Sequence, residues 1–311
     1  MPRIEVPSTE RLVRPTDELR PFTHLDHVSG DGMIDPMPVA DVNGVQLAYD
    51  VQGAGDPLVF VCGTGQRADS WGAMGIVAHG VAEGYQVITF DNRGMPPSTA
   101  PPGPYSVETM AADTASLIEH LGVRGVNVAG ISLGGFITFE LARTRPDLVR
   151  GAVCIAGLVG GSSYARLWIQ AWLEAVEGGI EVPRSLEYIG GLPSNLAPAT
   201  VQDDAAVELL VGLAPTALPD WQGPGRIGQY HADHDWMSRP KEWQARALGE
   251  TEVPVLVIAH EFDVVIPPAL LRWGAELLPA GRYVEIAGCG HAGVENIPAH
   301  REAMSKFFAG L

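Results

Sequence analysis

Short apolar runs that alternate with longer helical stretches limit most strongly what this 311-residue chain can fold into. The runs have the length of buried strands and are Leu58–Cys62, Gln86–Phe90, Val126–Ala129, Gly151–Ile155, Val253–Ala259 and Arg282–Ile286. The helical stretches are Trp71–Glu83, Ser106–Leu121, Leu133–Thr144, Pro267–Leu278 and Ile297–Phe308. This alternation favours a mostly parallel sheet with helices on both faces, because each parallel connection needs a crossover. The sequence therefore predicts an α/β protein, with an early hairpin over Val42–Val51.

Two segments depart from this alternation. Residues 1–40 carry scattered prolines and little periodicity, so we expect an N-terminal arm that is flexible or wraps the surface. Residues 157–250 hold many aromatic side chains, helical patterns and proline breaks, which predict a largely helical cap inserted into the fold. The α/β core would then comprise residues 41–156 and 251–311.

Charge and cysteine content exclude several classes of partner. The chain has 37 acidic and 20 basic side chains, a net charge of −17, and only two lysines. Nucleic acids and anionic membranes bind clustered cations, so we expect neither as a partner. Cys62, Cys154 and Cys289 lack metal-like spacing, which indicates a reduced compartment and no metal site. No apolar run approaches the ~20 residues of a membrane span and no signal segment is evident, so we expect a cytoplasmic protein.

A G-x-S-x-G motif, residues 130–134, lies between a predicted strand and a predicted helix. A sharp strand-to-helix turn strains the central serine and requires flanking positions without side chains, which Gly130 and Gly134 provide. Such a turn raises the Ser132 hydroxyl above the sheet and places the Leu133 amide beside it, where it can bind an oxyanion. An ordinary glycine-rich turn is the alternative, but the strand–turn–helix context favours a nucleophile.

A serine nucleophile needs a base and a group that orients the base. His291 follows the last predicted strand in a loop of small residues, and the other histidines fit less well, although His260 could line the site. Asp263, just after another strand, is the predicted acid, with Glu261 as the fallback. The chain order of serine, aspartate and histidine is that of one known class of catalytic triad.

The loop after the strand Leu58–Cys62 is the expected source of a second oxyanion donor. It reads Cys62-Gly63-Thr64-Gly65-Gln66, and the Thr64 amide is the first candidate, with Gly65 next. A plain glycine turn is the alternative, which the nearby elbow makes less favoured.

From about residue 42 to 309 the chain resembles the α/β-hydrolase superfamily, in the branch of small serine esterases, cofactor-free haloperoxidase-like enzymes and discrete thioesterases. The resemblance is carried by Gly63-Thr64-Gly65 with the following Trp71, by Asp91-Asn92-Arg93-Gly94 with Ser98, by the elbow Gly130–Gly134, by Asp263, and by Gly290-His291. The chain departs from the family pattern at Cys62, where a histidine is usual, and at Pro96 and Pro97. The resemblance implies an eight-stranded sheet, a cap over residues 157–250, the triad Ser132, Asp263 and His291, and no cofactor.

The residues and the resemblance together predict a serine hydrolase that cleaves an ester, thioester or lactone through an acyl-enzyme. A discrete thioesterase or cyclase of a polyketide-type pathway is the second enzymatic hypothesis. The expected partner is a small acyl substrate, free or borne by a carrier protein. A ligand-binding receptor on a hydrolase scaffold is the hypothesis from a different class, and the intact triad argues against it.

The aromatic residues of the insertion predict a fairly apolar substrate. The candidates that line the site are Gly65, Trp168, Trp172, Tyr230, His231 and Trp236. For Trp168 and Trp172, simple packing of the insertion onto the sheet is the competing interpretation.

Overall fold

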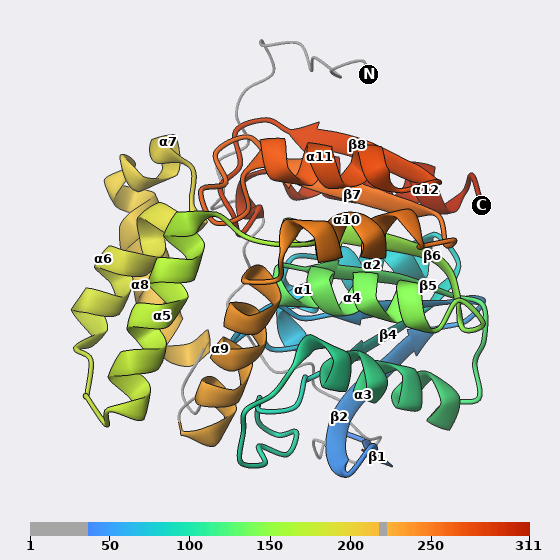
Figure 1. The fold of residues 1–311 in the computed structure, drawn as a ribbon, viewed down its shortest axis with the longest axis horizontal. Helices are drawn as coiled ribbons and strands as arrows, with labels where there is room; N and C mark the ends of the chain where they lie inside the picture. The colour runs from blue at the N-terminus through green and yellow to red at the C-terminus, as the bar shows by residue number, and fades with distance from the viewer. Residues whose placement is uncertain (1–36, 218–222) are drawn as a thin grey trace.

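The computed structural model describes residues 37–217 and 223–311, and within them the strands form one eight-stranded sheet (Figure 1). The strands are β1 (Val39–Val42), β2 (Val45–Gly53), β3 (Asp56–Val61), β4 (Tyr85–Phe90), β5 (Val126–Ile131), β6 (Val149–Ile155), β7 (Val255–His260) and β8 (Gly281–Ile286). Their order is β1-β2-β4-β3-β5-β6-β7-β8, with β2 antiparallel to both neighbours and every other pair parallel. The predicted α/β architecture with a mostly parallel eight-stranded sheet is confirmed.

The first two strands form the predicted hairpin. Asn43 and Gly44, with φ angles of 45° and 75°, make its two-residue turn, and such left-handed pairs match the twist of the flanking strands. Because β1 begins at Val39, the sheet starts slightly before the predicted boundary at residue 41. Residues 1–36 of the arm predicted over residues 1–40 lie outside the described residues.

Side chains alternate between the two faces of the central strands, so each face carries its own hydrophobic core. In β3, Val59 and Val61 belong to one core, whereas Leu58 and Phe60 belong to the other. The first core packs under α3 (Val107–His120), α4 (Leu133–Thr144), α10 (Lys241–Gly249) and α11 (Pro268–Leu277). The second packs under α1 (Asp69–Ala73), α2 (Ile76–Ala82) and α12 (Ile297–Phe308). Burial on both faces explains why these strands are almost continuously apolar.

Helix ends follow local sequence signals. Ser106 caps α3, accepting a hydrogen bond from the Thr109 amide at 3.2 Å, as the sequence predicts. The single helix expected over Trp71–Glu83 is wrong, because α1 and α2 are separate helices. Gly75 adopts a left-handed conformation (φ 64°) between them and therefore ends one helix before the next begins.

The chain between β6 and β7 carries the helices that interrupt the alternation: α5 (Ser163–Glu177), α6 (Arg184–Asn195), α7 (Pro198–Val201), α8 (Asp204–Ala217), α9 (Pro224–Met237) and α10. Figure 1 shows α5–α8 gathered beyond one end of the strands, with α9 between them and the core. We call α5–α9 the helical insertion. The last helix of this stretch, α10, packs beside α11 over the sheet.

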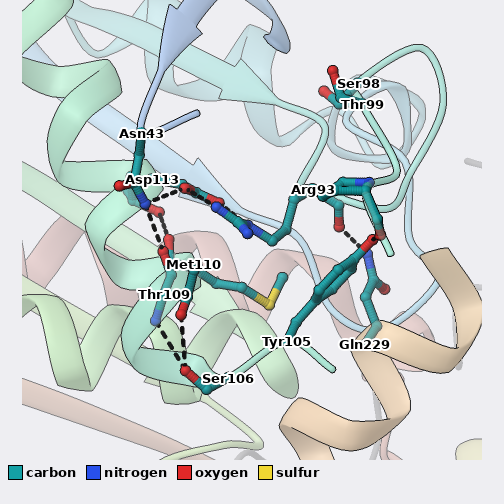
Figure 2. A network of polar contacts seen from close by, with 12 residues as sticks. Asn43, Arg93, Ser98, Thr99, Tyr105, Ser106, Thr109, Met110, Asp113 and Gln229 are labelled. Carbon is teal, nitrogen blue, oxygen red and sulfur yellow. Dashed lines mark hydrogen bonds and ion pairs between the residues drawn. The ribbon is translucent and has the colours of Figure 1, made fainter. Parts of the chain in front are cut away.

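A buried ion pair joins the loop after β4 to α3. The Arg93 guanidinium donates to both carboxylate oxygens of Asp113 at 2.5 and 2.6 Å, and Asn43 donates to the same carboxylate at 2.7 Å (Figure 2). Burial raises the pKa of Asp113, and the charge and hydrogen bonds of Arg93 oppose that rise.

We expect Asp113→Ala to lower the free energy of unfolding by about 3–5 kcal/mol, because it leaves the Arg93 charge buried without its partner. Asp56→Ala is the matched control. Asp56 pairs with Arg150 at 2.9 Å on the exposed surface, and such a pair contributes about 0–1 kcal/mol. Urea unfolding of the three proteins measures both effects, and equal losses for the two variants would contradict the expectation.

Candidate active site

Ser132 occupies a sharp turn between β5 and α4. Its φ and ψ angles are 55° and −120°, a strained conformation for a residue with a side chain. The main chain is so crowded here that a Cβ atom on Gly130 would lie 2.1 Å from the Gly134 carbonyl oxygen. A Cβ atom on Gly134 would lie 2.2 Å from the Val61 carbonyl oxygen of β3. Glycine at both positions is therefore required for this turn.

His291, in the loop after β8, contacts Ser132, and Asp263, in the loop after β7, contacts His291. The His291 Nε2 atom lies 2.9 Å from the Ser132 Oγ atom, and its Nδ1 atom lies 2.8 Å from Asp263 Oδ2. The other Asp263 oxygen accepts hydrogen bonds from the amides of Val265 and Ile266, both at 2.8 Å, which fixes the carboxylate. The structure thus brings together the three residues predicted from sequence, from loops far apart in the chain.

The fallback acid and the other nearby histidine lie elsewhere. Glu261 accepts a hydrogen bond from the Gly288 amide at 3.0 Å instead of contacting the imidazole of His291. His260 is fully buried behind the loop, with its Nε2 atom 2.8 Å from that of His300, so it does not line the site. Burial lowers the pKa of both His260 and His300, which favours neutral rings at this contact.

Charged neighbours favour a proton on His291. Burial by itself lowers the pKa of this imidazole, but the charge and hydrogen bond of Asp263 and the charge of Asp233 outweigh it and raise the pKa above its usual value. A base of this kind can accept a proton from a hydroxyl near neutral pH.

Backbone amides beside Ser132 form a candidate oxyanion site. Among the described residues, the amides of Leu133 and Thr64 have no hydrogen-bond partner. The neighbouring amides are occupied: Gly63 donates to Gln66 Oε1 at 2.8 Å, and Gly65 donates to Gln229 Oε1 at 2.9 Å. Of the two candidates in this loop, Thr64 therefore keeps an available amide and Gly65 does not.

A cavity of about 1390 Å³ lies over Ser132 and His291 and is roofed by the helical insertion. Its wall includes the predicted residues Trp168, Trp172 and Tyr230. The two tryptophans contact each other edge to face at 5.7 Å and also pack, partly buried, against the first hydrophobic core. Their position is compatible with both interpretations.

Three other predicted lining residues are not on the wall of this cavity. Gly65 is absent from the lining of the cavity, and its amide donates to Gln229. His231 points outward and pairs with Glu177 at 2.7 Å. Trp236 is buried against Phe136 and Phe139 of α4, and its indole donates to the Leu158 carbonyl. The predictions for His231 and Trp236 are corrected because side chains at different angles around α9 face different surroundings. The prediction for Gly65 is corrected because Gln229 occupies its amide.

The cavity also contains charged residues that the sequence did not single out. Asp233 lines it and accepts a hydrogen bond from the Thr64 hydroxyl at 2.5 Å. Arg226 lines it too, paired with Glu187 of α6 at 2.8 Å and lying 5.3 Å over the Trp172 ring. The spacing of Gln229 and Asp233, four residues apart on one helix, was the available signal, since such residues share a face.

The described residues contain no group of three histidine, cysteine, aspartate or glutamate side chains arranged to hold a metal ion. In the same part of the chain, no helix is long and apolar enough to cross a membrane.

Comparison with known proteins agrees with this geometry. Residues 56–179 match the family model of the alpha/beta hydrolase fold. A protein of Mycobacterium tuberculosis called putative non-heme bromoperoxidase BpoC is 36% identical over 268 residues, covering 86% of this chain and 99% of that protein. Its crystal structure superposes with a TM-score of 0.78 over 85% of this chain and 96% of that chain. The chain therefore belongs to the α/β-hydrolase superfamily.

More distant relatives carry other names. The rhodomycin D methylesterase DnrP of Streptomyces peucetius is 27% identical over 278 residues, covering 82% of this chain and 93% of that protein. A putative carbamate hydrolase, RutD of Azorhizobium caulinodans, is 26% identical over 262 residues, covering 82% of this chain and 92% of that protein. Enzymes named for hydrolysis thus recur among the relatives.

We expect the pKa of the His291 imidazole to lie above the usual 6.5 of a histidine. Asp263→Asn should lower this pKa, because it removes the negative charge that most favours the imidazolium form. Proton NMR of the ring, assigned with His291→Gln, measures both values. An unchanged His291 pKa in Asp263→Asn would show that the aspartate does not govern this proton.

Proposed function

We propose that this protein is a serine hydrolase that cleaves a carboxylic ester, thioester or lactone. The observation that carries the proposal is the continuous chain of contacts from Ser132 Oγ through His291 to Asp263. Ser132 and His291 line the cavity, and the amides of Leu133 and Thr64 beside them have no hydrogen-bond partner among the described residues. A nucleophile, a base, an orienting acid and an oxyanion site are the four parts that acyl transfer needs.

Each part has one task in the reaction. Ser132 attacks the carbonyl carbon of the substrate while His291 accepts the hydroxyl proton, and His291 then gives that proton to the leaving oxygen or sulfur. The amides of Leu133 and Thr64 bind the oxyanion of the tetrahedral intermediate. Water, activated by the same imidazole, then hydrolyses the acyl-enzyme and releases the acid. Asp263 stays ionised throughout and stabilises the imidazolium.

The wall of the cavity favours a large and fairly apolar substrate. Phe136, Trp168, Trp172, Val176 and Leu210 contribute apolar surface to it. The volume of about 1390 Å³ exceeds the range of about 300–1,000 Å³ typical for drug-sized ligands. The methylesterase name of the Streptomyces relative is compatible with ester chemistry on such a substrate. The same size keeps the discrete thioesterase or cyclase as a second candidate, since a long acyl chain would fill this space.

The bromoperoxidase name of the Mycobacterium relative belongs to that protein. Ester hydrolysis is proposed first here because the four parts and water supply every step, whereas halide oxidation needs peroxide and halide in addition.

We expect a fluorophosphonate to form one covalent adduct on Ser132, and Ser132→Ala to lose both the adduct and p-nitrophenyl ester turnover by about 10⁴-fold or more. Intact-mass spectrometry and absorbance at the same enzyme concentration provide the two readouts. Ser305→Ala, on the opposite side of the fold, is the control and keeps both. Absence of adduct and turnover in the wild type would support a ligand-binding protein instead.

We expect kcat/KM to rise from acetate to octanoate esters, because burial of each methylene contributes about 0.8 kcal/mol. That energy raises kcat/KM by at most about fourfold per methylene. Val176→Asp places a charge on the apolar wall of the cavity and should lower the octanoate-to-acetate ratio, whereas Val176→Ile should keep it. N-acetylcysteamine thioesters of the same acids test the thioesterase alternative. A rate that falls steadily with chain length would contradict the large apolar site.

A further inference from the structure

The helix α9 lies unusually close to the core of the fold. A Cβ atom on Gly225 would lie 2.0 Å from the Gly94 carbonyl oxygen, and one on Gly228 would lie 2.4 Å from the Tyr105 ring. Figure 2 shows Gln229 of α9 reaching the main chain of Arg93, and its side-chain amide donates to the Arg93 carbonyl oxygen at 3.0 Å. The buried pair of Arg93 and Asp113 holds that segment in turn. The helix is therefore fixed to a rigid part of the core.

This helix contacts two consecutive residues of the candidate oxyanion loop. Gln229 accepts a hydrogen bond from the Gly65 amide at 2.9 Å, and Asp233, one turn later, accepts one from the Thr64 hydroxyl at 2.5 Å. These contacts orient the loop. The Thr64 amide, which lies in the chain between the occupied amides of Gly63 and Gly65, stays available for the substrate. Asp233 is thus linked directly to the residue that supplies one oxyanion donor.

Asp233 has an unusual environment for a carboxyl group. Among the described residues it forms no ion pair with arginine or lysine, and the Thr64 hydroxyl is its hydrogen-bond partner. On its own helix, Arg226 is engaged by Glu187 and by the Tyr230 hydroxyl. Within the part of the chain that the structure describes, the charged group of the core that acts on Asp233 is His291. Burial raises the pKa of Asp233 to about 7, and the Thr64 hydrogen bond and His291 oppose that rise.

We propose that Asp233 is a positioning residue of the hydrolase, that its protonated form holds Thr64 for the oxyanion, and that its ionisation slows the reaction. This inference rests on the proposed function. A protonated carboxyl still accepts from the Thr64 hydroxyl through Oδ2, so the loop keeps its orientation. An ionised carboxylate adds a negative charge beside the position where the substrate oxygen itself becomes negative, and like charges in a buried site oppose each other.

The same charge acts on the base. Ionised Asp233 also stabilises the imidazolium form of His291, because its charge adds to the larger effect of Asp263 in raising the pKa of this ring. The two groups therefore titrate as a coupled pair, and the reactive form carries a single proton on Asp233 and none on His291. The rate should rise as His291 loses its proton and fall as Asp233 loses its own.

The test measures kcat/KM and kcat for a p-nitrophenyl ester from about pH 5 to about pH 10. The proteins are wild type, Asp233→Asn, Asp233→Ala and Asp235→Asn. Asparagine keeps the acceptor for Thr64 but cannot ionise. Asp235 is an exposed carboxylate on the same helix, paired with Arg239, and its variant is the matched control.

We expect a bell-shaped profile for the wild type, with the falling limb beginning near pH 7. Asp233→Asn should lose the falling limb and shift the rising limb to lower pH, because the charge that favours imidazolium is gone. Asp233→Ala should lower kcat by about tenfold or more with little change in KM, since Thr64 loses its partner. Asp235→Asn should follow the wild type.

A falling limb that persists in Asp233→Asn would overturn the proposal and assign it to another group, such as the buried Asp91, whose pKa burial also raises to about 7. A folded Asp233→Asn that is inactive at every pH would overturn it too, because the neutral side chain should suffice.

Infrared difference spectra of wild type minus Asp233→Asn give a readout that does not depend on turnover. We expect a protonated carboxyl band at pH 6 that disappears as the pH rises through about 7. Absence of that band overturns the inference even if the protein is a hydrolase. If the band is present and wild type shows no Ser132-dependent turnover, the proposed function fails while the protonated Asp233 stands.

Discussion

The tightly packed turn from β5 into α4 at Ser132 is the constraint on which the rest of the site depends. The main chain of this turn touches β3 through Gly134 and the chain after β6 through Gly157, whose added Cβ would lie 2.2 Å from the Ser132 carbonyl oxygen. Gly130, Gly134 and Gly157 thus allow main chain to pack directly on main chain. This packing holds Ser132 in a backbone conformation that costs on the order of 1–3 kcal/mol. The Leu133 amide, the Ser132 hydroxyl and the cavity floor are all placed by it.

Three buried carboxyl groups near the site differ through their partners. Asp113 is paired with a guanidinium, and Asp263 is bound by an imidazole and two amides. Asp233 accepts from the Thr64 hydroxyl, and within the described ranges it forms no ion pair with arginine or lysine. Since desolvation penalises the charged form and opposite charges favour it, the partners decide which of these groups carries a proton. Aspartate thereby supplies a structural ion pair at Asp113 and, in our proposal, the acid that orients His291 at Asp263 and a neutral positioning residue at Asp233.

The helical insertion covers the cavity and also supports the loops of the candidate site. Its residues also support the loops that carry the site: the Asn195 carbonyl accepts from the Ala292 amide at 2.8 Å, and Glu295 accepts from the Ala197 amide at 2.7 Å. The helix α9 holds the candidate oxyanion loop through Gln229 and Asp233. Movement of the insertion would therefore alter the proposed base and the proposed oxyanion donors together with access to the cavity.

The sequence by itself determined the parallel sheet, the elbow at Ser132 and the choice of His291, because strand periodicity and glycine-flanked turns are local properties. It ranked Asp263 before Glu261 and Thr64 before Gly65, but it kept the second residue of each pair as an alternative. Only the tertiary structure decided these, by showing which carboxylate meets the imidazole and which amide Gln229 occupies. The wall of the cavity was decided in the same way: Trp236 and His231 belong to the same helix as Tyr230 but face the core and the solvent. The orientation of a helix about its axis depends on what it packs against, and for α9 that is a set of loops distant in the chain.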